Sequence, residues 1–244
     1  MINKKLEWEK NKKNGFPHAI VDNFLDKDTC LKLYEECINA PRGGWTSFTR
    51  AGSSMEEFND LIHCPTAHKI TYDLMYSGEF LYDLEQMSGI SGLLPDPHLV
   101  GAGFSIFRNG SYLGCHYDFN WNDRLRLHRK LTSILFLTPD WENEWGGDHQ
   151  AWTGNYETDK NVKLITEVSP KFNRFLITEN EKHKPYHSVK KINCPENIQG
   201  RCAIRFFYYI STSEYNKDNP PHKSTYSSME YTHKKLYKKE LWVI

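Results

Sequence analysis

The sequence has no excess of charge of either sign. Its 31 Lys and Arg residues balance 31 Asp and Glu residues, which leaves a formal net charge of zero at pH 7. Attraction to the phosphates of nucleic acids or to anionic lipid requires a basic excess. We therefore expect neither nucleic acid nor a membrane surface among the partners of this chain.

Long apolar runs are absent as well. One of the longest, Ser133 to Leu137, covers five residues including its serine, whereas a membrane-spanning helix needs about 20. Residues 1–14 are rich in Lys and Glu, and no apolar stretch or small-residue cleavage site follows them. The sequence thus predicts no transmembrane helix and no secretory signal, and we expect a cytoplasmic location.

Cysteine is scarce. The six cysteines contain no Cys-x-x-Cys pair and are too few for a disulfide scaffold in a chain of 244 residues. We expect all six to be free thiols.

The first hundred residues mix one strand with helices. Residues 16–25 are typical of a short strand, after which Asp28 can cap a helix that ends near Asn39. A second, mainly helical region spans about 65–88. The residues expected to form the apolar stripe of the first helix are Leu31, Tyr34 and Ile38.

From about Leu99 onward the sequence changes to short runs of Phe, Ile, Val, Thr and Tyr between turn residues. Such strands indicate a sandwich, barrel or jelly roll, with the helices packed on one face of the sheet. We expect a mainly β fold with supporting helices (α+β) in one domain, residues 1–244. Its expected parts are a helix-rich segment (about 1–95), a jelly-roll core (about 96–212) and a C-terminal tail (about 213–244). The tail carries a basic patch, interpreted as a solvated helix face or a docking site for an acidic partner: Lys234, Lys235, Lys238 and Lys239.

The residues with the clearest chemistry are a histidine and an aspartate two positions apart. Side chains alternate along a strand, so His116 and Asp118 lie on the same face. His187, in another strand-like run, offers a third ligand, with His183 as the alternative. Two imidazoles and one carboxylate on one face of a metal leave three octahedral positions open, which is the ligand set of non-haem iron(II) oxygenases.

Two arginines, Arg201 and Arg205, interrupt the strand-like aromatic run GRCAIRFFY (200–208). They are four residues apart, so on a strand they point to the same face. Arginine in an apolar strand is costly unless it meets an anion, and its planar guanidinium can hold a carboxylate through two hydrogen bonds. Arg201 is therefore a candidate anchor for a dicarboxylate cosubstrate, with Arg205 or a purely structural ion pair as the alternatives.

These residues, in this order and spacing, resemble the Fe(II)/2-oxoglutarate-dependent dioxygenases, specifically their prolyl 4-hydroxylase-like branch. The resemblance covers roughly residues 90–210. It extends beyond the candidate ligands to four blocks in the same order as in the family: GSYLGCHYD (110–118), RKLTSILFL (129–137), DWENEWGG (140–147) and SPKFNR (169–174).

The resemblance implies a double-stranded β-helix, a cupin-like jelly roll, with iron at its open mouth. It implies that His116, Asp118 and His187 hold Fe(II) and that Arg201 pairs with the distal carboxylate of 2-oxoglutarate. It also implies hydroxylation of an unactivated C–H bond with O2, with ascorbate as a reductant. Thr132 falls where a strand residue lines the cosubstrate pocket. Phe136 stands where many relatives carry a tyrosine, so the hydroxyl that assists Arg201 would come from Tyr112 or Thr132.

The substrate is less well defined by the sequence. We expect a protein or peptide side chain, with proline as the first candidate, or a free amino acid. Candidate substrate residues are Tyr117, Arg205 and Trp121, the last in a polar loop (119–126) that we expect to cover the substrate. His128 and His149 are interpreted as surface or loop histidines.

Two other classes of function fit the same ligands. One is a non-catalytic, cupin-like jelly roll that binds a metal or ligand, and the other is a zinc hydrolase built on the same His, Asp and His. Arg201 separates them from a dioxygenase, because neither class needs a buried cation placed to receive a dicarboxylate.

Overall fold

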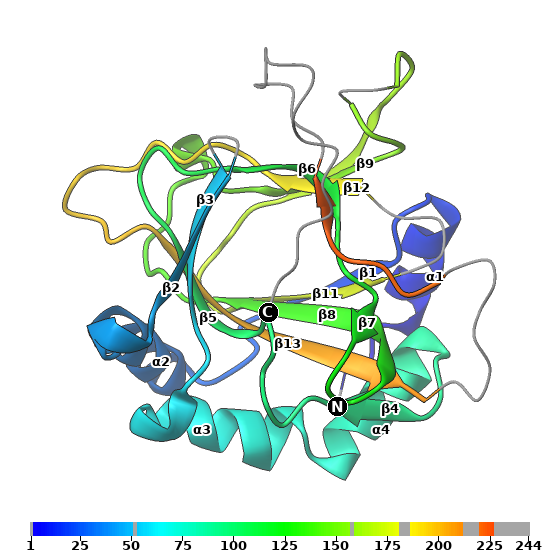
Figure 1. Ribbon diagram of the computed structural model, residues 1–244, viewed down its shortest axis with the longest axis horizontal. Coiled ribbons are helices and arrows are strands. Elements are labelled where there is room, and N and C mark those ends of the chain that lie inside the picture. The colour runs from blue at the N-terminus through cyan, green and yellow to red at the C-terminus, as the bar shows by residue number, and fades with distance from the viewer. Residues whose placement is uncertain (1, 51–52, 157–158, 181–185, 212–219, 227–244) are drawn as a thin grey trace.

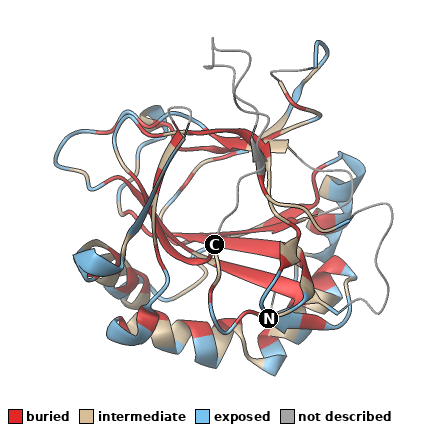
Figure 2. Cartoon of the chain, in the orientation of Figure 1, coloured by how far each residue is buried: buried red, intermediate tan, exposed pale blue. Residues whose placement is uncertain are grey.

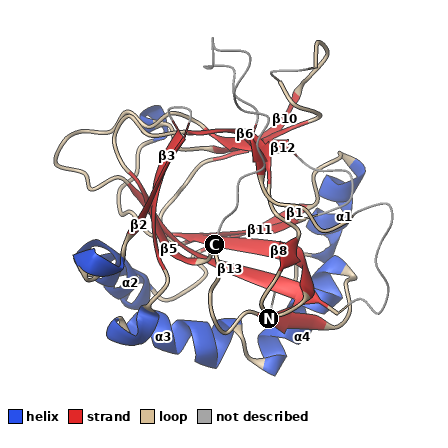
Figure 3. Ribbon diagram, in the orientation of Figure 1, coloured by secondary structure: helices blue, strands red, loops and turns tan. Residues whose placement is uncertain are grey.

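The computed structural model describes residues 2–50, 53–156, 159–180, 186–211 and 220–226. Two antiparallel sheets face each other, and the helices gather along the outer side of the larger sheet (Figures 1 and 3). This is the expected α+β, double-stranded β-helix architecture. None of the helices in the described ranges is long and apolar enough to cross a membrane.

The larger sheet has the strand order β1-β11-β8-β13-β5-β3-β2, with β4 on β13 and β7 on β8. Its strands are β1 (His18–Asp22), β2 (Thr46–Arg50), β3 (Ser53–Phe58), β4 (Leu93–Pro95), β5 (Gly103–Phe107), β7 (Trp121–Asn122), β8 (Leu127–Phe136), β11 (Arg174–Glu179) and β13 (Arg201–Ile210). The smaller sheet, in the order β10-β9-β12-β6-β14, contains β6 (Leu113–Tyr117), β9 (His149–Trp152), β10 (Leu164–Val168), β12 (Tyr186–Val189) and β14 (Thr225–Tyr226).

In the described ranges, four α-helices and several shorter turns of helix precede or join these strands. The α-helices are α1 (Lys5–Lys13), α2 (Lys27–Asn39), α3 (Pro65–Lys69) and α4 (Gly78–Ser88). A π-helical turn (Ile70–Met75) joins α3 to α4, and 3-10 turns occupy Arg42–Gly44, Leu61–His63 and Asn143–Trp145. The predicted helical region 65–88 is therefore three consecutive helical pieces.

Helix α2 differs from the prediction at its start and on its buried face. Its N-cap is Asp26, whose carboxylate accepts the Thr29 backbone N–H at 2.9 Å, whereas Asp28 lies inside the first turn. The most deeply buried residues of α2 are Cys30, Leu33 and Cys37, and the predicted stripe of Leu31, Tyr34 and Ile38 lies half-buried beside them. Small thiols at this face allow the helix to approach the sheet closely.

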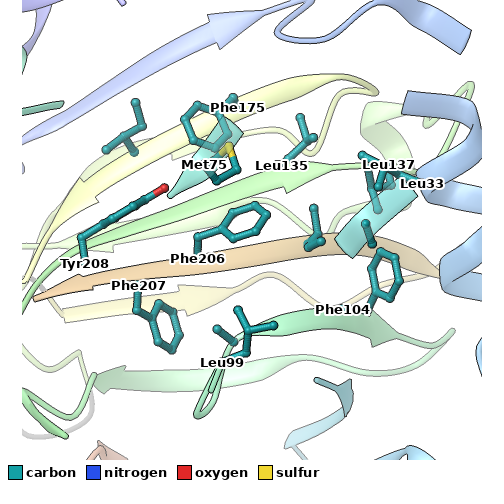
Figure 4. Close-up of a cluster of buried hydrophobic side chains, with 14 of the residues drawn as sticks. Leu33, Met75, Leu99, Phe104, Leu135, Leu137, Phe175, Phe206, Phe207 and Tyr208 are labelled. Atoms are coloured by element: carbon teal, nitrogen blue, oxygen red, sulfur yellow. The ribbon is translucent and has the colours of Figure 1, made fainter. Parts of the chain in front are cut away.

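The side chains of strand β13 alternate between the two faces of the large sheet, one toward the helices and the other toward the small sheet. Figure 4 shows Phe206 and Tyr208 on one side of the strand, among Met75 and Phe175, and Phe207 on the other. Because side chains alternate along a strand, Arg201 and Arg205 share the side of Phe207. The central strands of this sheet are largely buried (Figure 2), and both arginines line a cavity on this side.

All six cysteines are free and buried, as predicted. Most of the predicted C-terminal tail, including its four lysines, lies outside the described residues. The described part of the tail adds β14 to the edge of β6, with Thr225 opposite Tyr117.

Candidate active site

Two adjacent strands of the small sheet bring the three candidate metal ligands together. β12 pairs antiparallel with β6 in a register that places His187 directly opposite His116, and Asp118 follows the end of β6. The Nε2 atoms of His116 and His187 lie 3.4 Å and 3.6 Å from Oδ1 of Asp118. One ligand atom from each residue lies within 4.8 Å of the others, so a single ion can contact all three.

The backbone orients the first imidazole. Nδ1 of His116 donates a hydrogen bond to the carbonyl oxygen of Gly114 at 2.8 Å, which leaves the Nε2 lone pair directed toward Asp118 and His187. Burial, followed by the nearby imidazole of His187, lowers the pKa of His116. The neutral form that a metal requires is therefore favoured.

Asp118 is held by an arginine that the sequence analysis missed. Nη2 of Arg129 donates to Oδ2 of Asp118 at 2.9 Å and to Oγ1 of Thr132 at 2.5 Å. The Arg129 guanidinium is packed between the rings of Phe119 and Phe207, 4.7 Å and 3.4 Å from their centroids. Burial by itself would raise the pKa of Asp118, but Arg129 and the two histidines outweigh it and hold that pKa well below its usual range.

The sequence did contain a signal for Arg129. Like Arg201, it is an arginine next to an apolar strand run, and such a residue needs an anion nearby. Its partner could not be identified from the sequence, because Arg129 and Asp118 are separated by the loop that includes β7.

A cavity of about 320 Å³ between the two sheets contains the three candidate ligands. His149 joins His116 and His187 on the small-sheet side, and β8 and β13 supply the facing wall. Arg201 lines the same cavity, and so do Arg205 and Thr132.

Arg201 is a buried cation with no hydrogen-bonded anion among the described residues, and Asp148 acts on it only through its charge. Arg201 is 3% exposed, and within the described structure neither Nε nor Nη1 has a hydrogen-bond partner. The rings of Phe107 and Phe136 lie on it with centroids 4.9 Å from Cζ. Burial, and then repulsion from Arg205, lowers the pKa of Arg201 to about 9. A buried guanidinium in this state is built to receive an anionic ligand.

Phe136 and Gly147 shape the space around this cation. Phe136 supplies an aromatic face and no hydroxyl. Gly147 has φ +76°, and a Cβ atom there would lie 3.1 Å from Cδ of Arg201. Glycine at this turn therefore leaves the room that the arginine stem occupies.

The other predicted site residues are distributed in and around the cavity. Thr132 lines it, but its hydroxyl accepts a hydrogen bond from Arg129. Arg205 lines it and donates a hydrogen bond to Glu57, so it is not the unpaired cation of the two arginines on β13. Tyr112, Tyr117 and Trp121 are not among the described residues that line the cavity. Trp121 packs edge-on against His128, with ring centroids 4.8 Å apart.

The interpretation of His128 and His149 as surface or loop histidines is wrong. Both are buried, and His149 on β9 stacks on His187 with a centroid distance of 5.1 Å. The sheet pairing of β9 with β12 produces this contact, and no local sequence pattern reports it. His183, the alternative third ligand, lies outside the described residues.

Residues 102–209 match the model of the 2OG-Fe(II) oxygenase superfamily. This region belongs to that superfamily. The matched segment holds His116, Asp118, His187 and Arg201, and it lies within the predicted jelly-roll core of about 96–212. A comparison with curated protein sequences gave no match.

Solved oxygenase structures share the fold at low sequence identity. A prolyl hydroxylase from Trichoplax adhaerens, in complex with a hypoxia inducible factor peptide fragment, gives a TM-score of 0.58 at 18% identity, over 82% of this chain and 86% of that chain. A Pseudomonas putida prolyl-4-hydroxylase gives 0.59 at 12% identity, over 84% and 98%. HygX from Streptomyces hygroscopicus, with nickel, 2-oxoglutarate and hygromycin B bound, gives 0.55 at 9% identity, over 94% and 98%.

Residues 102–209 therefore form a 2OG-Fe(II) oxygenase domain, and the prolyl hydroxylase structures share its fold. The two other classes considered for the sequence, a non-catalytic jelly roll and a zinc hydrolase, fit the unpartnered guanidinium of Arg201 less well. Fe(II) and 2-oxoglutarate are its metal and cosubstrate, and a use of ascorbate stays a prediction.

Proposed function

We propose that His116, Asp118 and His187 bind the Fe(II) of this oxygenase and that Arg201 binds the distal carboxylate of 2-oxoglutarate. The observation that carries the assignment is the unpartnered Arg201 guanidinium, which lines the same cavity as three converging ligand atoms. Both halves of the site have the chemistry of the group they would receive: neutral imidazole and carboxylate for the metal, and a buried cation for the diacid.

The iron, when bound, couples oxidative decarboxylation of 2-oxoglutarate by O2 to hydroxylation of a substrate C–H bond, so that one oxygen atom enters succinate and the other enters the product. The chain's own residues hold and screen these reactants. The Gly114 carbonyl orients His116, Arg129 keeps Asp118 ionised, and Phe107 and Phe136 exclude water from Arg201. A low-dielectric wall strengthens the pairing of Arg201 with a carboxylate.

The substrate of this proposal is a peptide side chain, with proline as the first candidate, or a small molecule such as a free amino acid. The structurally similar proteins include both kinds, a prolyl hydroxylase with a peptide and HygX with hygromycin B.

The test uses the full chain with Fe(II) and 2-oxoglutarate in the absence of oxygen. We expect a visible metal-to-ligand charge-transfer absorption only when both are present, because 2-oxoglutarate takes open positions on facially held iron. Admitting O2 should release succinate, and a chelator should remove both signals. Equal turnover with zinc, or succinate formation after complete removal of iron, would contradict the proposal.

Arg129→Met should weaken iron binding by about 10–100-fold, the usual effect of losing a partner of a metal-binding carboxylate. The methionine keeps the aliphatic contact with Phe119 and Phe207 but removes the hydrogen bond to Asp118. Anaerobic titration with Fe(II) measures the change. Arg124 is an exposed arginine of the preceding loop. Arg124→Met is therefore the matched control and should bind iron as the unsubstituted chain does. Unchanged affinity in Arg129→Met would show that Asp118 does not depend on this contact.

A further inference from the structure

A second pair of charged side chains lies on the large-sheet wall of the cavity. Arg205, four residues after Arg201 on β13, donates a short hydrogen bond from Nη2 to Oε1 of Glu57 on β3. The side chains are 14% and 20% exposed, and both line the cavity that holds the proposed iron ligands. β3 lies next to the edge strand β2 of the large sheet (Figure 1), so the pair lies toward that edge of the cavity.

The hydrogen-bonding capacity of this pair is largely unused. Arginine has five N–H donors. Among the residues that the structure describes, Nε of Arg205 is buried without a partner and Nη1 reaches only the weakly accepting Sδ of Met55, at 3.6 Å. Within the described residues, Arg205 is the only side chain that donates to the Glu57 carboxylate. Buried polar groups are normally satisfied, so the pair can still receive one anion at Arg205 and one donor at Glu57.

A neighbouring pair shows what a closed, structural ion pair looks like in this sheet. Glu56 and Glu57 are adjacent on β3 and therefore point to opposite faces. Glu56 accepts from both Nε and Nη2 of Arg108, at 3.1 Å and 2.8 Å, and Nη1 of Arg108 donates to the carbonyl oxygen and to the side-chain oxygen of Gln199. Glu56 and Arg108 are not among the cavity-lining residues. Of these two pairs, only Arg205–Glu57, inside the cavity, has arginine N–H groups that lack an oxygen acceptor among the described residues.

The size of the cavity limits what can meet this pair. A volume of about 320 Å³ is at the lower end of the roughly 300–1,000 Å³ of cavities that hold one small ligand. This cavity must also hold 2-oxoglutarate against Arg201. The space that remains between the sheets suits a free amino acid or a single side chain, so the charges of the pair have to distinguish the two.

We propose that the substrate is a free α-amino acid whose carboxylate binds Arg205 and whose ammonium group binds Glu57. Those two groups are attached to one carbon atom, which matches two opposite charges in direct contact. A residue in the interior of a peptide has neither charge, and a chain end has only one of them. The inference rests on the proposed function, because the amino acid would be hydroxylated at the iron held by His116, Asp118 and His187.

The test measures succinate release by the iron-loaded full chain with the standard L-amino acids, their N-acetyl and carboxamide derivatives, and peptides that contain them. At least one free amino acid should stimulate release above the rate without substrate. Blocking either of its charged groups should lower kcat/KM by about tenfold or more, because each blocked form loses a charge-assisted hydrogen bond in a buried site.

Variants connect this preference to the pair. Glu57→Gln keeps the shape of the side chain and should raise KM for the amino acid by about tenfold or more, while the dissociation constant of 2-oxoglutarate, measured without oxygen, stays within about twofold since Glu57 does not contact Arg201. Arg205→Lys retains the cation and should lose less affinity than Arg205→Met. Glu56→Gln, on the outer face, is the matched control and should leave both constants unchanged.

Three results would overturn the inference: equal use of free, blocked and peptide-linked substrates, an unchanged KM in Glu57→Gln, or no stimulation by any free amino acid. The anaerobic absorption with Fe(II) and 2-oxoglutarate separates this failure from that of the proposed function. If the absorption is present and one of the three results is obtained, only the amino-acid assignment is wrong. If the absorption is absent, the iron and 2-oxoglutarate assignment fails first.

Discussion

We expect Asp118→Ala to abolish succinate formation and to lower iron affinity by more than the roughly 100-fold that loss of a supporting contact costs. The carboxylate is the central member of the group, since its Oδ1 lies within 3.6 Å of both imidazole Nε2 atoms. Its removal also leaves Arg129 buried without its anion, at a cost of about 3–5 kcal/mol of stability. Anaerobic Fe(II) titration, succinate release and thermal unfolding measure the three effects.

A second substitution separates loss of the metal from loss of the fold. His116→Ala removes a ligand and leaves the Arg129–Asp118 pair intact, so iron binding should be lost with a smaller change in the unfolding temperature. Asp123→Ala, an exposed aspartate five residues after Asp118, should behave like the unsubstituted chain in all three measurements. Full turnover in His116→Ala or Asp118→Ala would refute the metal assignment.

Arg201→Met should weaken 2-oxoglutarate binding by on the order of 2–5 kcal/mol, which is at least about 30-fold. The arginine would form a charge-assisted pair with the distal carboxylate in a buried pocket, and methionine offers no charge there. Calorimetric titration of the iron-loaded, oxygen-free protein measures the change. Arg201→Lys keeps the charge but loses the planar guanidinium, so its affinity for 2-oxoglutarate should lie between those of the unsubstituted chain and Arg201→Met.

Arg201→Met should also change the stability of the protein in the absence of 2-oxoglutarate. Without cosubstrate the Arg201 guanidinium is desolvated and has no hydrogen-bonded anion among the described residues, so Arg201→Met should unfold at an equal or higher temperature. Added 2-oxoglutarate should raise the unfolding temperature of the unsubstituted chain but not that of the variant. Lys171→Met, at an exposed cation, should retain the ligand-dependent increase. A variant that is both destabilised and still stabilised by 2-oxoglutarate would show that Arg201 is structural.

The sequence predicted the parts of the site that depend on local geometry. His116 and Asp118 share a face because side chains alternate along a strand, and Arg201 and Arg205 share one for the same reason. His187, in another strand-like run, was a candidate third ligand beside His183. The resemblance to a known family favoured it, and the structure places it opposite His116. The mainly β fold with supporting helices was likewise predicted from local patterns of strand and turn residues.

Contacts across the sheets were not accessible from the sequence. Arg129 reaches Asp118 over an intervening loop, and His149 stacks on His187 because β9 and β12 are neighbours. Even the start of α2 depended on tertiary context, since two aspartates stand two residues apart and the structure selects Asp26 as the cap.

By itself, the sequence determined which residue types are present, which of them share a face of a strand, and the order in which they follow along the chain. Only the tertiary structure decided which charge has a partner: Arg129 with Asp118, Arg205 with Glu57, and Arg201 with none among the described residues. The reason is physical. Side-chain alternation is a property of one strand, whereas the pairing of charges depends on strand register and on the distance between two sheets, which are set by the packing of the whole chain.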